Sequence, residues 1–111
     1  MLYISVEDFL TQAKTAPCIS WDEKKSLAQQ MAAGDQAARQ TLIRSHLPLV
    51  AAFVARAPQS IRTLHTVYAC IAAVEKSLTK LPAQQDNKTF THDLNWQLRQ
   101  CITKCIADQS R

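Results

Sequence analysis

The sequence predicts an all-α fold, a compact helical domain of about five helices. The 111 residues include a single glycine, whereas the tight turns of β-hairpins, sandwiches and barrels usually need several. Alanine, glutamine, leucine and lysine, which favour helix, are abundant. At this length, with 47% hydrophobic residues, the chain is long enough for one globular core but not for two.

Helix-capping and helix-breaking residues define two helices at the start of the chain. The first helix is expected over residues 6–14 and ends before Pro17, because proline cannot continue a helix. Ser20 and Glu23 have the spacing of a capping box, in which the two side chains satisfy free amides of the first turn. The second helix therefore begins there and runs to Gly34, a residue that suits a helix C-terminus.

The middle of the chain predicts two longer helices. Asp35 caps the first of them, Pro48 is expected to kink it, and Pro58 closes it. Apolar residues at helical spacing make its buried stripe: Ile43, Leu47, Val50 and Val54. The next helix has its own apolar side and is expected to end at Pro82, and residues 83–88 then form a polar loop.

The last helix, over residues 90–104, divides into two faces. Its apolar stripe consists of Leu94, Leu98, Cys101, Ile102 and Cys105. Trp96 falls on the opposite face, close to Arg99, Gln100 and Thr103. A large ring among long polar donors suits a nucleic-acid surface, since the ring can stack and the polar groups can bond bases or phosphates. The alternative is that Trp96 packs against a neighbouring helix.

Charge and hydropathy limit the partners. The net charge of +4 and the pI of about 9.0 allow a polyanion such as nucleic acid without requiring one. We find neither an apolar run long enough for a membrane span nor a secretory leader. The sequence thus predicts a cytoplasmic protein without a membrane partner, and it leaves the oligomeric state open.

The cysteines predict neither a metal site nor a catalytic one. Cys101 and Cys105 are one helical turn apart, but zinc needs two more ligands and no histidine has a suitable spacing. On an apolar face, cysteines act as small core residues in a reducing compartment. Cys70 with a distant histidine is an unspecific pair, and we find no phosphate-binding glycine loop or nucleophile elbow. We therefore expect no enzyme, no cofactor and no small-molecule substrate.

Three segments carry the pattern of a known family. Residues 27–50 are the most specific, with Leu-Ala, Ala-Gly-Asp, Ala-Ala-Arg and Leu-Ile-Arg-Ser-His-Leu-Pro-Leu-Val in register without a gap. Residues 9–24 and residues 90–103 supply the other two segments. Together they make residues 4–107 resemble the N-terminal part of bacterial sigma-70 family transcription initiation factors, namely conserved regions one-point-two and two.

The resemblance implies a DNA-binding role for the last helix. In the family, this part of the protein recognises and melts the minus-ten element of the promoter. Gln100 and Thr103 stand at positions that read the first base pair of that element, and Trp96 at the position of a tryptophan that props open the melted strand. Arg99 matches an arginine near the phosphates, and we include Lys104 in the same DNA-binding set.

The resemblance also implies a second partner, the RNA polymerase core. We expect the polymerase contact at Leu64, His65 and Tyr68 on the preceding helix. The family pattern divides the single domain into a part that resembles region one-point-two, residues 1–34, and a part that resembles region two, residues 35–111.

Departures from the family keep a second hypothesis open. Asp93 replaces the tyrosine that stacks on a flipped base, and Gln97 replaces the second tryptophan. Ile61 and His65 replace acidic residues that meet the polymerase. The chain also ends at Arg111, before the helix-turn-helix domain of full-length members, so we expect an excised domain or a stand-alone remnant. The alternative function is a protein-interaction module with the sigma fold that has lost promoter melting and core binding.

Overall fold

A computed structural model describes residues 3–109, and these fold into six α-helices and two short 3-10 helices. The helices are α1 (Val6–Ala13), α2 (Trp21–Ala32), α3 (Gln36–Ser45), α4 (Leu47–Arg56), η1 (Gln59–Ile61), α5 (Leu64–Leu78), η2 (Leu81–Ala83) and α6 (Asn87–Gln109). The predicted all-α class is confirmed, with one helix more than the five expected.

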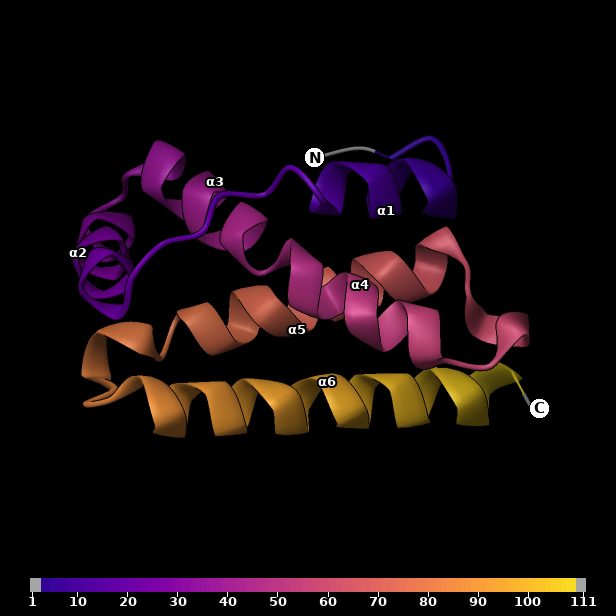
Figure 1. The fold of residues 1–111 in the computed structure, drawn as a ribbon. Coiled ribbons are helices and arrows are strands. Elements are labelled where there is room, and N and C mark those ends of the chain that lie inside the picture. Colours follow the sequence, from indigo (N-terminus) through magenta and orange to yellow (C-terminus); the bar gives the residue numbers. More distant parts are fainter. Residues whose placement is uncertain (1–2, 110–111) are drawn as a thin grey trace.

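The fold is elongated and measures 40 × 25 × 21 Å along its principal axes. α5 and α6 lie side by side and antiparallel, and α6 forms one long outer edge of the molecule (Figure 1). α4 packs on both of them, and α1 covers the other side of α4. α2 and α3 pack together at one end, where α2 also meets η2. This arrangement leaves one whole side of α6 free of neighbouring helices.

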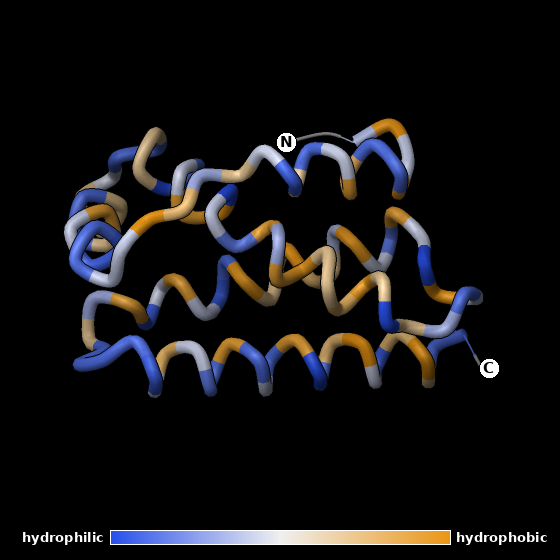
Figure 2. Tube along the Cα trace, in the orientation of Figure 1, coloured by the Kyte–Doolittle hydropathy of each residue, from blue (hydrophilic) through white to orange (hydrophobic). Residues whose placement is uncertain are grey.

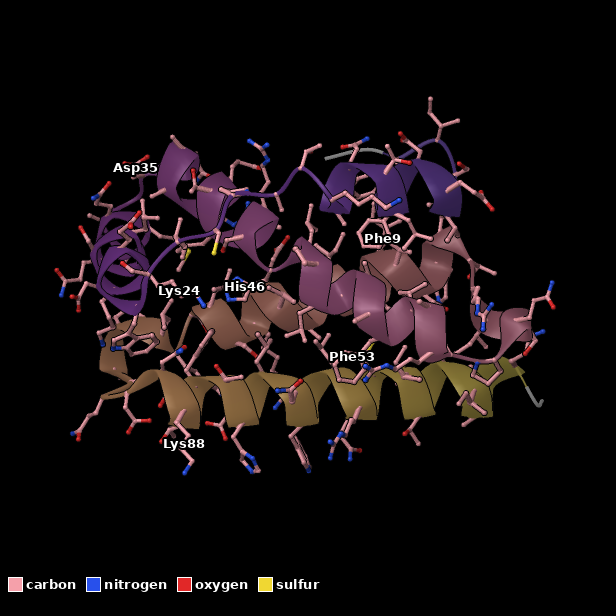
Figure 3. The ribbon with its side chains drawn as sticks, viewed as in Figure 1. Phe9, Lys24, Asp35, His46, Phe53 and Lys88 are labelled. Carbon is pink, nitrogen blue, oxygen red and sulfur yellow. The ribbon has the colours of Figure 1, made fainter. Side chains whose placement is uncertain are left out.

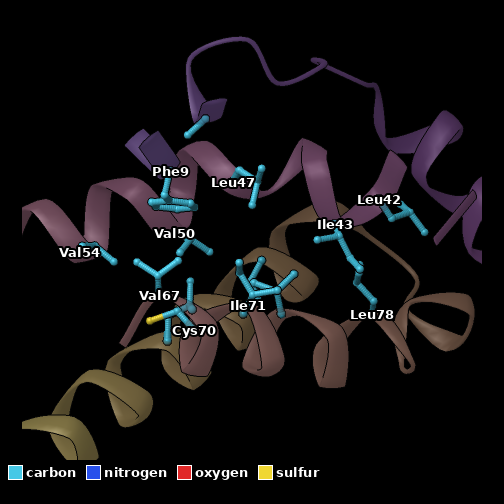
Figure 4. Close-up of a cluster of buried hydrophobic side chains, with 14 of the residues drawn as sticks. Phe9, Leu42, Ile43, Leu47, Val50, Val54, Val67, Cys70, Ile71 and Leu78 are labelled. Atoms are coloured by element: carbon cyan, nitrogen blue, oxygen red, sulfur yellow. The ribbon is translucent and has the colours of Figure 1, made fainter. Parts of the chain in front are cut away.

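One continuous core joins all six helices. Figure 4 shows part of it, with Phe9 of α1 above Val50 and Val54 of α4, and Val67 and Ile71 of α5 beneath them. Burial of each such side chain contributes about 1.5–3 kcal/mol, which makes this cluster the main source of stability. α6 adds its own buried residues to the same cluster: Phe90, Leu94 and Leu98.

The predicted caps by Ser20 and Asp35 are present, but the Glu23 carboxylate accepts a hydrogen bond from the Ser20 hydroxyl over 3.3 Å and not from a backbone amide. The hydroxyl of Ser20 accepts a hydrogen bond from the Glu23 amide over 3.2 Å at the start of α2. Asp35 accepts from the Ala38 amide over 3.1 Å at the start of α3. Gly34 lies between the two helices with a φ of 101°, a left-handed conformation that favours glycine. The boundary between α2 and α3 is therefore fixed by the sequence.

The expected kink at Pro48 is a complete break. α3 ends at Ser45, α4 begins at Leu47, and His46 serves as the C-cap of one and the N-cap of the other. A proline in the first turn of a helix loses no backbone hydrogen bond, since the amides there lack helical partners in any case. A new helix at this point is thus less costly than a bent one, which explains the sixth helix.

The connection between α5 and α6 differs from the prediction. α5 ends at Leu78, four residues before Pro82, which lies within η2. Asp86 accepts a hydrogen bond from the Thr89 amide over 2.7 Å, and α6 already begins at Asn87. This bond holds the pKa of the Asp86 carboxyl below its usual range. The predicted polar loop over residues 83–88 is therefore shorter, and the last helix is longer at both ends than expected.

Candidate nucleic-acid interface

The side of α6 that faces away from the other helices carries the five residues predicted to contact DNA. Trp96 is 53% exposed, and the side chains of Arg99, Gln100, Thr103 and Lys104 are exposed as well. The opposite side carries the residues of the predicted apolar stripe, of which two are buried and three half-buried: Leu94 and Leu98, then Cys101, Ile102 and Cys105. Trp96 therefore faces solvent and does not enter the core.

One row of exposed side chains, spaced four residues apart, winds across this side of α6 and turns by about 40° at each step. It consists of Lys88, His92, Trp96, Gln100 and Lys104, and we call it the α6 row. Figure 3 shows Lys88 pointing away from the helical body. Along α6, hydrophilic and hydrophobic residues alternate with the helical repeat, as Figure 2 shows. The row spans about 24 Å, at 1.5 Å per residue.

Two members of this row, Lys88 and His92, were missed by the sequence analysis. Lys88 falls in the polar run over residues 83–88, which predicts a loop, whereas His92 lies within the predicted helix but was not included in its polar set. Asp86 is a good N-cap residue, and its position would have placed Lys88 on the helix.

A hollow of about 240 Å³ opens beside Trp96, between α6 and the end of α5. Asp93 and Gln97, which stand where the family has aromatic residues, line this hollow together with Trp96. The amide of Gln84 donates a hydrogen bond to the Asp93 carboxylate over 3.4 Å. The side of the hollow nearest Trp96 is therefore polar, and its remaining lining residues are Ser77, Lys80 and Phe90.

A second hollow, of about 420 Å³, lies on the other flank of the α6 row. Arg99 and Thr103 line it from α6, and Arg56 lines it from the end of α4. Phe53, which Figure 3 shows between α4 and α6, contributes to its apolar lining. The structure thus brings a second guanidinium, that of Arg56, next to the predicted DNA-binding residues. No sequence signal identified Arg56, since it belongs to a different helix.

The charge of α6 is only weakly positive. Its basic residues are Lys88, Arg99 and Lys104, and its acidic residues are Asp93 and Asp108, which gives 3 − 2 = +1. Arg56 and Lys80 border the two hollows and add to this field. The surface attracts polyanions, and Asp93 opposes that attraction close to Trp96.

The three residues predicted to meet the polymerase lie on α5, apart from both hollows. His65 is exposed, whereas Leu64 and Tyr68 are half-buried. The hydroxyl of Tyr68 accepts a hydrogen bond from the Tyr3 amide over 2.9 Å. Tyr68 therefore links the start of the chain to α5, and His65 is the member of the set that is most open to a partner.

The described residues contain neither a metal-binding cluster nor a membrane-spanning helix. Among residues 3–109, no group of three histidine, cysteine, aspartate or glutamate side chains is arranged to hold a metal ion. Over the same residues, no helix combines the length and the apolar character needed to cross a bilayer.

Two curated bacterial proteins are similar to nearly the whole chain. The chain is 29% identical over 113 residues to "RNA polymerase sigma factor SigA" of Clostridium acetobutylicum, a match that covers 97% of this chain. It is 30% identical over 110 residues to "RNA polymerase sigma factor SigA" of Lactococcus lactis subsp. cremoris, with 96% of this chain covered. The chain is a divergent relative of the bacterial sigma-70 factors. It spans about 30% of the length of each of these two relatives.

Two other comparisons found nothing: no family model and no solved structure matches this sigma relative. The resemblance stated from its motifs is nevertheless confirmed by the two curated proteins. The residues predicted from the resemblance to read DNA, Gln100 and Thr103, lie on the exposed side of α6. The two departures of this sigma relative on that helix, Asp93 and Gln97, coincide with the polar hollow beside Trp96.

Proposed function

We propose that this chain is a sigma-like transcription initiation domain that docks its α6 row on the minus-ten element of promoter DNA and binds RNA polymerase core. One observation carries the proposal. The residues at the family's DNA-reading positions all lie exposed on one side of one helix, and that side is free of neighbouring helices. Such a surface is accessible to a duplex without any rearrangement of the fold.

The chemistry of the row fits a duplex. An α-helix with its side chains is about 10–12 Å wide, and the major groove is about 12 Å wide. Lys88, Arg99 and Lys104 supply the phosphate contacts, which position the helix on the backbone. Gln100 and Thr103 supply donors and acceptors for base edges, and a glutamine amide pairs best with adenine.

Trp96 stands between these residues and the polar hollow, where it acts as a wedge at the edge of the duplex. Capture of a single strand needs flat stacking surfaces, and Asp93 and Gln97 do not provide them. The Asp93 carboxylate also repels phosphate. We therefore propose that docking on double-stranded DNA is retained and that strand capture is weak.

The polymerase contact is proposed at the start of α5, with exposed His65 at its centre and half-buried Leu64 beside it. Tyr68 would contribute mainly by holding this end of α5 in place through its bond to Tyr3. The division into residues 1–34 and residues 35–111, which follows the family pattern, is part of the same proposal.

The DNA part is tested by fluorescence anisotropy with a labelled minus-ten duplex and a scrambled duplex, at several salt concentrations. We expect tighter binding to the minus-ten duplex and a steep loss of affinity as salt rises. Gln100→Ala should remove about 1–3 kcal/mol of that preference, which is the range for one good base contact. Gln29→Ala, an exposed glutamine on α2, is the matched control and should change nothing.

Lys104→Ala should act differently from Gln100→Ala. Loss of a phosphate contact weakens binding to both duplexes equally and reduces the salt slope by about 1. Equal affinity of the unmodified chain for the minus-ten and scrambled duplexes would remove the claim of promoter recognition.

The polymerase part is tested by a pull-down of purified core enzyme at low salt, with His65→Ala as the variant. We expect retention of the core by the unmodified chain and reduced retention by the variant. The alternative function, a protein-interaction module that has lost promoter melting, is favoured by Asp93 beside Trp96 and by the charge of only +1 on α6. Absence of both core retention and promoter preference would support that alternative.

A further inference from the structure

A hollow of about 490 Å³ opens where α2, α3, α5 and η2 meet, and no residue of α6 lines it. Its apolar lining includes the fully buried Leu78 and the half-buried Met31 and Pro82. The volume falls within the range of about 300–1,000 Å³ that is typical of small-molecule sites. The hollow therefore has the size and the apolar lining that the body of a small organic ligand needs.

Three charged side chains line the same hollow. Arg39 of α3 and Glu75 of α5 form an ion pair, with 2.6 Å between Nη2 and Oε2, and Lys76 follows Glu75 on α5. Two cations and one anion give the lining a net charge of 2 − 1 = +1. A ligand with one carboxylate brings this charge to zero, whereas an amine raises it. The charges therefore favour a ligand with a single negative group.

The guanidinium of Arg39 can bind a second carboxylate while it keeps Glu75. It carries five N–H donors in a planar fork, and among residues 3–109 its one hydrogen bond is the bond from Nη2 to Glu75. Arg39 and Glu75 also line a second hollow, of about 210 Å³, between α3 and α5. The ion pair thus borders both hollows, and with each side chain 38% exposed its guanidinium is accessible to a ligand.

We propose that the larger hollow binds a small organic acid that joins one carboxylate to an apolar body. The carboxylate lies between Arg39 and Lys76, and the apolar body covers Met31, Leu78 and Pro82. The site is separate from the α6 row, so this binding does not depend on the proposed contact with DNA. No sequence signal indicated the site, because its residues come from four different elements.

The test uses the full isotope-labelled chain with octanoate as the probe, followed by two-dimensional NMR and by thermal unfolding. We expect saturable shifts of the amides of Met31, Ala72 and Thr79, which line the hollow, and a raised unfolding midpoint. Octylamine has the same apolar chain with the opposite charge, and acetate has the carboxylate without the chain. Each of them should bind at least about tenfold more weakly than octanoate, since each lacks one of the two kinds of contact.

Two adjacent residues of α5 should act in opposite directions. Lys76→Gln lowers the charge of the lining from +1 to zero and should weaken octanoate binding. Glu75→Gln raises that charge to +2 and removes the carboxylate that competes for Arg39, so it should strengthen binding. Lys80→Gln is the matched control, because this exposed lysine lines the hollow beside Trp96 instead, and it should leave the affinity unchanged.

Three outcomes would overturn the proposal. One is the absence of saturable shifts at the hollow. Another is equal binding of octanoate and octylamine, which would mean that the charges of the lining do not select the ligand. The third is an equal loss of affinity in Lys76→Gln and Lys80→Gln, which would mean that octanoate responds to the overall charge of the chain and not to this site.

Discussion

The ammonium group of Lys25 donates a hydrogen bond to the carbonyl oxygen of Pro82 over 2.7 Å. It also donates to the carbonyl oxygens of Leu81, over 3.1 Å, and Gln84. The same group lies 5.7 Å from the centre of the Trp21 ring. One side chain of α2 therefore satisfies the carbonyls of the turn that leads into α6.

Lys25→Met should destabilise the fold by about 2 kcal/mol, because hydrogen bonds to charged groups contribute about 1.5–3 kcal/mol. Their loss also leaves partly buried carbonyl groups without a donor. Urea unfolding monitored by circular dichroism measures this. The control is Lys24→Met, the next residue of α2, which leaves the donor to the turn in place. An equal loss in both variants would mean that the hydrogen bonds are not the cause.

The stability of the fold should depend on His46. Its Nδ1 donates to the Leu42 carbonyl over 2.7 Å, and its Nε2 is buried without a partner among the described residues. Burial lowers the pKa of His46 below its ordinary value of 6.5, the charge of Lys24 lowers it further, and the bond to Leu42 opposes them. The unfolded chain then binds more protons than the folded chain as pH falls below 6.5.

The free energy of unfolding should therefore fall as pH decreases from 6.5 to the lowered pKa of His46. Urea titrations at several pH values check this. His46→Gln keeps a donor but cannot titrate, so its stability should vary less with pH in that range. The same slope in both proteins would show that other groups are responsible.

The ion pair between Arg39 and Glu75 should contribute little to the free energy of unfolding. Its atoms are 2.6 Å apart, but each side chain is 38% exposed, so water and salt screen the attraction. Glu75→Gln should cost less than about 1 kcal/mol, and the difference should shrink at high salt. Urea unfolding at low and high salt measures both effects. A loss as large as that expected for Lys25→Met is inconsistent with screening.

Variants of Trp96 and Leu98, which lie two positions apart on α6, should separate effects on stability from effects on DNA binding. Leu98 is fully buried, and Leu98→Ala should cost about 2–5 kcal/mol of stability. Trp96→Ala removes a side chain that is 53% exposed, so it should change stability far less and weaken DNA binding by about 1–3 kcal/mol. Thermal unfolding and anisotropy on the same samples test this contrast. A reversed order of the two stability changes would place Trp96 in the core.

Asp93→Asn should strengthen binding to DNA. The carboxylate lies on the helix that we propose to dock on DNA, and its removal raises the charge of α6 from +1 to +2. Anisotropy at low salt should show tighter binding to any duplex, with a smaller gain at high salt. Asp108→Asn makes the same charge change about 22 Å along α6, at 1.5 Å per residue, and should give a smaller gain.

The sequence was sufficient for the parts of the fold that local chemistry decides. Ser20, Asp35 and Gly34 marked helix ends because a side-chain oxygen or a left-handed residue acts on its immediate neighbours. Helical periodicity placed Trp96 opposite the apolar stripe of its helix, but it left open whether the ring packs against a neighbouring helix. The family resemblance added which of the exposed residues to examine.

The rest depended on contacts between distant residues. Lys25 reaches carbonyls 56 to 59 positions away, and nothing in the local pattern of α2 indicates that. Arg56 joins the α6 surface only because α4 crosses it. The break at Pro48 was expected as a kink, although a proline in the first turn of a new helix loses no backbone hydrogen bond.

The bond between Tyr3 and Tyr68 has a consequence for the order of folding. It joins residues 65 positions apart, whereas only nine positions, 87 − 78, separate the end of α5 from the start of α6. By the logarithmic dependence of loop closure on length, the longer closure costs about 2 kcal/mol more in chain entropy. The α5–α6 hairpin can therefore assemble by itself early. α1 packs later, once the surface that it contacts has formed.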